Sequence, residues 1–118
     1  MTKIHDTIPV LPVKSIADSV RFYTDVLGFK EDFATPGMAS VSRDGCRVML
    51  DALRPTAGAA WVWMGVSDET WFTEWQDRGV AVLQAPQNHP WAYEMKFADP
   101  DGNTLWLATA TKPELPFD

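Results

Sequence analysis

The sequence has very few of the side chains that form disulfides and soft-metal centres. It contains one cysteine, Cys46, and two histidines, His5 and His89. A single cysteine excludes an internal disulfide, and one thiol with two imidazoles cannot assemble a Cys/His zinc cluster. Cys46 lies at a predicted turn with nothing nearby to activate its thiolate. We expect both histidines to be surface residues.

Long apolar runs and positive charge are also scarce. No apolar stretch reaches the ~18 residues of a transmembrane helix, and residues 1–6 lack the hydrophobic region of a signal peptide. We therefore expect a cytoplasmic protein without membrane contact. The net charge of -6 argues against nucleic acid as a partner and mildly favours cationic partners.

Tryptophan, in contrast, is abundant. The chain has six tryptophans in 118 residues, although tryptophan is normally among the rarest residue types. Such an excess favours either a heavily aromatic core or a site at which planar molecules stack. The length itself is that of one ordinary globular domain.

The first half of the chain shows the pattern of a strand, a helix and three more strands. Residues 8–13 are β-rich, and their two prolines confine them to an edge or an end of a sheet. Ser15 is a predicted helix N-cap, an apolar stripe continues to Leu27, and Gly28 stands where a helix commonly ends. The three strands then expected are residues 29–34, 38–42 and 47–51.

The same pattern returns in the second half. We predict a strand at residues 60–66, a helix that opens at residues 67–70 and ends at Gly79, and three strands from residue 80 onward, the last two joined at Asp-Pro-Asp-Gly-Asn, residues 99–103. The prediction is an α+β fold of duplicated β-α-β-β-β modules. It is one domain over residues 1–118, with modules at about 7–52 and 59–110 and a linker-like stretch at 54–58.

One helix per module can cover only one face of its sheet. We therefore expect the helices on the convex faces of curved sheets and a concave groove on the other side. Strand alternation assigns six residues to the groove: Met49, Asp51, Trp61, Trp63, Thr104 and Trp106. It assigns another six to the helix side: Val48, Leu50, Val62, Met64, Leu105 and Leu107. Modules of ~50 residues bury too little core alone, so the sheets must pair with each other or with a second chain.

Four segments of the chain carry a resemblance. They are residues 8–11 running into 19–29, Asp32-Phe33, residues 60–63 with Trp75, and Pro90-Trp91 through residue 103. Together they resemble the vicinal-oxygen-chelate superfamily of glyoxalases, extradiol dioxygenases and fosfomycin-resistance transferases, and within it the bleomycin-resistance binding proteins. The helix motif and Asp-Pro-Asp-Gly-Asn mark the superfamily, whereas the Trp-Val-Trp and Pro-Trp pairs are more specific to the bleomycin binders.

The resemblance also exposes a departure from the superfamily's enzymes, which hold a divalent metal with His and Glu side chains on the concave face. The matching positions here are Ile8, Trp61 and Trp106. None of these side chains offers a lone pair suitable for such a metal. We therefore expect no metal, no other cofactor and no enzymatic activity.

The bleomycin binders are homodimers that sequester a cationic, planar-tailed antibiotic in grooves built from both chains. The resemblance implies the same function here, namely antibiotic resistance by stoichiometric capture. Three alternatives remain: a glyoxalase- or dioxygenase-like enzyme with a displaced metal site, a binder of another flat aromatic molecule, and a protein whose tryptophans form an obligate interface.

The candidate ligand-binding residues combine indoles with acids. By resemblance, Trp91 stacks on the flat bithiazole of the antibiotic, and Met38 replaces an aromatic residue that packs on the ligand. The whole set is Asp32, Phe33, Met38, Met49, Asp51, Trp61, Trp63, Trp91 and Trp106. Glu94 is a weaker candidate because Lys96 shares its face. Trp71 and Trp75 have helical spacing and are predicted core or dimer contacts.

Overall fold

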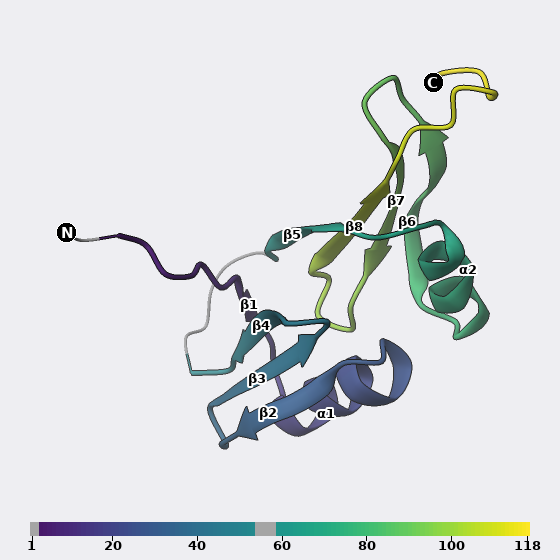
Figure 1. Cartoon of the computed structure of the whole chain (residues 1–118). Coiled ribbons are helices and arrows are strands. Elements are labelled where there is room, and N and C mark those ends of the chain that lie inside the picture. The colour runs from purple at the N-terminus through teal and green to yellow at the C-terminus, as the bar shows by residue number, and fades with distance from the viewer. Residues whose placement is uncertain (1–2, 54–58) are drawn as a thin grey trace. The chain divides into compact units, whose positions relative to one another are not determined.

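The computed structural model describes residues 3–53 and 59–118, and the chain divides into two compact units (Figure 1). The N-terminal unit is Met1–Gly58 and the C-terminal unit is Ala59–Asp118. The predicted linker at residues 54–58 lies outside the described residues. No helix among the described residues has the length and apolar character that a membrane span requires.

The N-terminal unit is a four-stranded sheet with one helical segment on one face (Figure 1). The sheet order is β1-β4-β3-β2, with β1 parallel to β4 and the other neighbours antiparallel. Its elements are β1 (Val10–Pro12), α1 (Ile16–Arg21), the π-helical η1 (Phe22–Val26), β2 (Lys30–Ala34), β3 (Met38–Arg43) and β4 (Cys46–Asp51).

The start and end of this helical segment follow from its sequence. The Ser15 hydroxyl accepts a hydrogen bond from the backbone N–H of Asp18, at 3.2 Å, so the predicted N-cap is confirmed. Gly28 has a φ of 81° at the predicted end, where a residue without Cβ avoids strain. The apolar stripe buries Ile16, Tyr23 and Leu27. The π-helical turn was not predicted, and Thr24 lies within it, donating its hydroxyl to the Val20 carbonyl at 2.7 Å.

The C-terminal unit repeats this topology. Its elements are β5 (Trp61–Gly65), α2 (Thr70–Asp77), β6 (Ala81–Asn88), β7 (Tyr93–Ala98) and β8 (Thr104–Thr109). The sheet order is β5-β8-β7-β6, with β5 parallel to β8. In both units, the first strand therefore lies beside the last strand of the same sheet. The predicted α+β fold of duplicated β-α-β-β-β modules is confirmed.

Aromatic contacts fix α2 on one face of its sheet. Trp75 is fully buried and packs edge-to-face against Phe97, with ring centroids 5.3 Å apart. Phe72 stacks on Tyr93 at 5.5 Å. Of the two predicted roles for Trp75, core or dimer contact, the structure shows the core, and the face opposite α2 carries the remaining strand side chains.

The turn between β7 and β8 holds the start of β5 in place. Asp99 Oδ1 accepts hydrogen bonds from the backbone N–H groups of Asp101 and Asn103, each at 2.9 Å, and Gly102 takes a φ of 81°. The buried Asn103 amide oxygen then accepts the N–H of Ala60 at 2.8 Å. Because Ala60 directly precedes β5, this motif aligns the strand that carries Trp61 and Trp63 with β8.

Candidate functional site

The face of the C-terminal sheet opposite α2 gathers three indoles and an ammonium group. Strand register pairs Trp63 with Trp106 and pairs Trp106 with Lys96. Paired residues point to the same side of a sheet, and the alternate residues Phe97, Leu105 and Leu107 are buried on the α2 side. The alternation therefore assigned these residues to the correct faces. We call Trp61, Trp63, Lys96 and Trp106 the tryptophan face.

The tryptophan face is a set of mutual ring contacts. Trp61 and Trp106 meet edge-to-face with centroids 6.1 Å apart. Lys96 Nζ lies 4.4 Å from the ring centroid of Trp106 and 5.5 Å from that of Trp61, within cation–π range of both. Trp61 and Trp63 are each 60% exposed. These rings therefore present flat apolar surface on which a planar group can stack.

A glycine on β5 shapes this surface. A Cβ placed on Gly65 would lie 2.9 Å from Cη2 of Trp63. The Trp63 indole therefore extends along its own strand over Gly65. Any larger residue at position 65 would displace the ring, so the glycine sets the direction in which Trp63 points.

Trp91 lies apart from the tryptophan face, in the connection between β6 and β7, and is 72% exposed. It stacks on His89 with centroids 4.6 Å apart and an interplanar angle of 5°. His89 Nε2 lies 3.6 Å from Glu94 Oε1. His89, expected at the surface, instead has only 16% of its side chain exposed. One face of the Trp91 indole thus lies against the His89 imidazole, whose Nε2 is near the Glu94 carboxylate.

Five candidate residues belong to the N-terminal unit: Asp32, Phe33, Met38, Met49 and Asp51. Register pairs Phe33 with Ser40, Ser40 with Met49, and Met38 with Asp51, which places these partners on one face of the sheet. Phe33 is 40% exposed, whereas Asp51 is 5% exposed. Asp51 Oδ1 accepts the backbone N–H of Leu53 at 2.8 Å, so this carboxylate supports the strand end.

Asp32 is engaged by neighbours in its own sheet. Its carboxylate accepts hydrogen bonds from Ser42 Oγ at 2.8 Å and Ser40 Oγ at 2.9 Å, and Arg47 Nε lies 3.9 Å away. The Ser42 hydroxyl, followed by Ser40 and the positive charges of Arg47 and Lys30, lowers the pKa of Asp32 against the opposing effect of burial. Hydroxyl donors and positive charges within the N-terminal unit therefore compensate much of the negative charge of Asp32.

The residues present do not fit the divalent-metal centre that the superfamily's enzymes hold on their concave face. Trp61 and Trp106 place indoles at two of the matched positions, 6.1 Å apart. Within residues 3–53 and 59–118, no three side chains of His, Cys, Asp or Glu lie together as a metal site would require.

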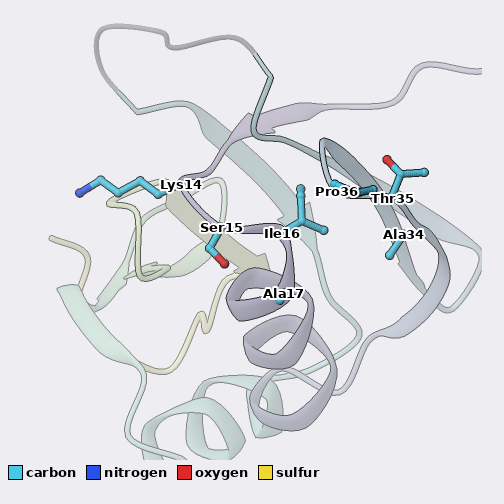
Figure 2. A pocket seen from close by; sticks show the side chains of 7 residues that line it. All are labelled: Lys14, Ser15, Ile16, Ala17, Ala34, Thr35 and Pro36. Atoms are coloured by element: carbon cyan, nitrogen blue, oxygen red, sulfur yellow. The ribbon is translucent and has the colours of Figure 1, made fainter.

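One cavity, of about 540 Å³, lies in the N-terminal unit beside the start of α1 (Figure 2). It is lined by Lys14, Ser15, Ile16, Ala17, Ala34, Thr35 and Pro36. Figure 2 shows the Lys14 side chain extending away from the other lining residues. None of the candidate ligand-binding residues lines this cavity, and its wall offers no stacking surface.

Comparison with known proteins decides the family. The Glyoxalase/Bleomycin resistance protein/Dioxygenase superfamily matches residues 4–107, which is most of the chain. The chain belongs to this superfamily. No curated protein sequence matches it. Since the name of the superfamily covers enzymes and resistance proteins alike, membership alone does not separate the two.

Three solved structures with the same fold are similar to the chain. The antibiotic-binding protein TnmS3 from Streptomyces sp. CB03234 has 27% identity and a TM-score of 0.82, over 94% of this chain and 99% of that one. The bleomycin-binding protein of Streptomyces verticillus, solved with copper(II)-bleomycin, has 26% identity and a TM-score of 0.76, over 95% and 100%. A Nocardioides superfamily member has 21% identity and a TM-score of 0.74, over 100% and 91%, and shows the shared fold.

Three interacting residues were missed by the sequence reasoning. The sequence pattern indicates Lys96 only as a neutraliser of Glu94 and gives no role to His89, and it does not predict that Gln84 Oε1 accepts a hydrogen bond from Lys96 Nζ at 3.1 Å. The available signals were weak: Lys96 shares its strand face with Glu94, and His89 precedes Trp91 by two residues across a proline. These spacings predict which side chains are near one another but not which groups they contact.

Proposed function

We propose that this protein is a non-catalytic binding protein that captures a planar small-molecule antibiotic on its exposed indoles. The observation that carries the proposal is the exposure of Trp61, Trp63 and Trp91, at 60%, 60% and 72%. Core indoles bury their rings, as Trp75 does, whereas stacking sites hold them open to a guest. The antibiotic-binding relatives support the same class of guest.

The strength expected of such a site follows from its rings. Stacking of a planar group on an aromatic side chain contributes on the order of 1–3 kcal/mol. Two or three such contacts sum to about 2–9 kcal/mol, and the upper end of that range corresponds to a dissociation constant on the order of micromolar. That range suits stoichiometric capture of a drug, and we propose bleomycin as the first ligand to test.

The experiment is a titration with bleomycin and copper(II)-bleomycin, followed by intrinsic tryptophan fluorescence and by calorimetry. We expect Trp91→Ala to weaken binding by about tenfold or more, with little dependence on salt, because stacking is not a charge interaction. Trp71→Phe is the matched control, since Trp71 lies on α2 and packs against Trp75 at 6.2 Å.

Two results would contradict the proposal. If the purified protein held stoichiometric metal whose removal abolished a chemical activity, the superfamily's enzymatic function would be favoured instead. If Trp91→Ala bound the drug as tightly as the parent while losing thermal stability, the indole would be structural. Circular dichroism must first show that each variant is folded.

A further inference from the structure

The polar groups at the centre of the tryptophan face are hydrogen-bond donors. Lys96 Nζ lies over the Trp106 ring, and Trp106 Nε1 is buried with no hydrogen-bond acceptor among the described residues. Trp75 in the core also has an unpaired indole N–H, so an orphaned donor alone does not mark a site. What distinguishes Trp106 is the ammonium group beside it.

The charge of Lys96 is met by dipoles and rings rather than by a carboxylate. Its ammonium donates to Gln84 Oε1 at 3.1 Å, which occupies one of its three N–H groups. Glu94, two residues away on the same strand face, lies instead against His89. Across residues 3–53 and 59–118, Lys96 forms no ion pair, and its other donors face the indoles Trp61 and Trp106.

This arrangement has a consequence for any guest on the tryptophan face. A cationic group stacked there would meet the positive charge of Lys96, and like charges repel strongly where apolar rings displace water. An anionic oxygen would instead accept a charge-assisted hydrogen bond from Lys96 Nζ. The net charge of -6 describes the whole surface, whereas Lys96 sets the local preference.

We propose that Lys96 determines specificity: the tryptophan face takes a planar aromatic ligand that carries an anionic oxygen beside its rings, such as a carboxylate, a sulfonate or an ionised phenol. This inference rests on the proposed function, because it assumes that the exposed indoles bind a small molecule. It narrows the ligand class from planar antibiotics in general to those with an acidic substituent at the stacking site.

Three matched probes test the inference: 2-naphthoate, 2-naphthamide and 2-naphthylmethylammonium, which share one ring system and differ in charge. Binding is followed by the indole N–H signals in NMR spectra, assigned with single Trp→Phe variants. We expect naphthoate to bind the parent protein about tenfold more tightly than naphthamide, with the ammonium probe weakest. Acetate added in excess is the control for unspecific anion binding and should not displace naphthoate.

Two variants isolate the charge. Lys96→Met keeps an unbranched apolar side chain over the indoles, so naphthoate should lose its tenfold advantage while naphthamide binding changes by less than about twofold. Lys96→Arg keeps the charge and should keep the preference for naphthoate.

Equal binding of naphthoate and naphthamide, or tightest binding of the ammonium probe, would overturn the inference and leave the stacking site standing. An unchanged preference in Lys96→Met would also overturn it, because the selectivity would then come from another group. If no probe moved the signals of Trp61, Trp63 or Trp106, the inference would fail, while the bleomycin titration would still decide the proposed function separately.

Discussion

Asp32 illustrates how a residue's neighbours change its role. The acidic side chain was a candidate counter-ion for a cationic ligand, since it lies beside Phe33 on the open face of its sheet. Two serine hydroxyls and Arg47 already surround the carboxylate. Its main contribution is therefore to join β2 to β3 and β4 at the irregular pairing between Glu31 and Phe33.

We expect Asp32→Asn to lower the melting temperature by a few degrees at neutral pH. The folded-state pKa of Asp32 is lowered from 3.8, so its stabilisation is present above 3.8 and is lost as pH falls through the lower folded value. The difference in stability between parent and variant should accordingly shrink in acid. Thermal melts across the acidic range measure it.

Ser42→Ala provides the control for this prediction. If the Ser42 hydroxyl is the main partner of the carboxylate, Asp32→Asn should cost less in the Ser42→Ala background than in the parent. A pH-independent difference in stability between the parent protein and the Asp32→Asn variant would show instead that the ionised carboxylate contributes nothing to folding.

For individual residues, the sequence predicted which face of the sheet a side chain lies on but not which groups that side chain contacts. Period-two alternation assigned Trp61, Trp63 and Trp106 to the side opposite α2, because one-face burial fixes register. It could not predict that Lys96 would lie over two indoles, or that His89 would support Trp91. Long and aromatic side chains choose among rotamers according to neighbours from other strands, and those neighbours are known only after folding.

At the scale of elements, the C-terminal unit continues beyond β8 with a segment at residues 111–118. The buried Asn88 at the end of β6 holds this segment: its Nδ2 donates to the carbonyls of Lys112 at 2.8 Å and of Leu115 at 3.3 Å. Its Oδ1 accepts from the backbone N–H of Lys112 at 2.9 Å and from the Thr111 hydroxyl at 3.1 Å. The predicted module ended at about residue 110, and no periodic pattern beyond it indicated this docking.

We expect Asn88→Ala to destabilise the protein by about 2–4 kcal/mol, because several buried partners lose their hydrogen bonds together. Residues 111–118 should also become accessible to carboxypeptidase. Urea unfolding and limited digestion measure the two effects. Gln87→Ala is the matched control on the same strand and should change stability by less than about 0.5 kcal/mol. Protection of the segment in Asn88→Ala would refute the role of this side chain.

Most element positions were predictable because each carries a local signal. Gly28, Gly45, Gly79 and Gly102 all adopt positive φ at predicted ends or turns. The prediction for the first strand, residues 8–13, was longer than β1, which covers Val10–Pro12, although the Pro9 carbonyl still accepts the Met49 N–H at 2.9 Å and the Val13 N–H donates to the Asp51 carbonyl at 3.0 Å. The π-helical turn at Phe22–Val26 was missed, because periodicity barely distinguishes one helical turn from another.

At the scale of the whole molecule, two small units make up the chain. Each unit has about 60 residues, and units of this size have little independent stability. The edge strands β2 and β6 are poor sites for adding a strand from another chain. Asp32 lies at an irregularity in β2, and Pro86 lies in the irregular stretch of β6 between Gln84 and Gln87. Of the four edge strands, which also include β1 and β5, these two are therefore disfavoured for association, and the open sheet faces are the expected contact surface.

We accordingly predict a two-fold dimer in solution, of twice the chain mass of 13.2 kDa. Sedimentation equilibrium at micromolar concentration should give that mass, and the melting temperature should rise with protein concentration, because unfolding of a dimer releases two chains. A bound drug that touches both chains would tighten the dimer further, whereas a drug held by one chain would leave its dissociation constant unchanged. A well-folded monomer at micromolar concentration, with a melting temperature independent of concentration, would contradict the dimer and place the whole binding site within a single chain.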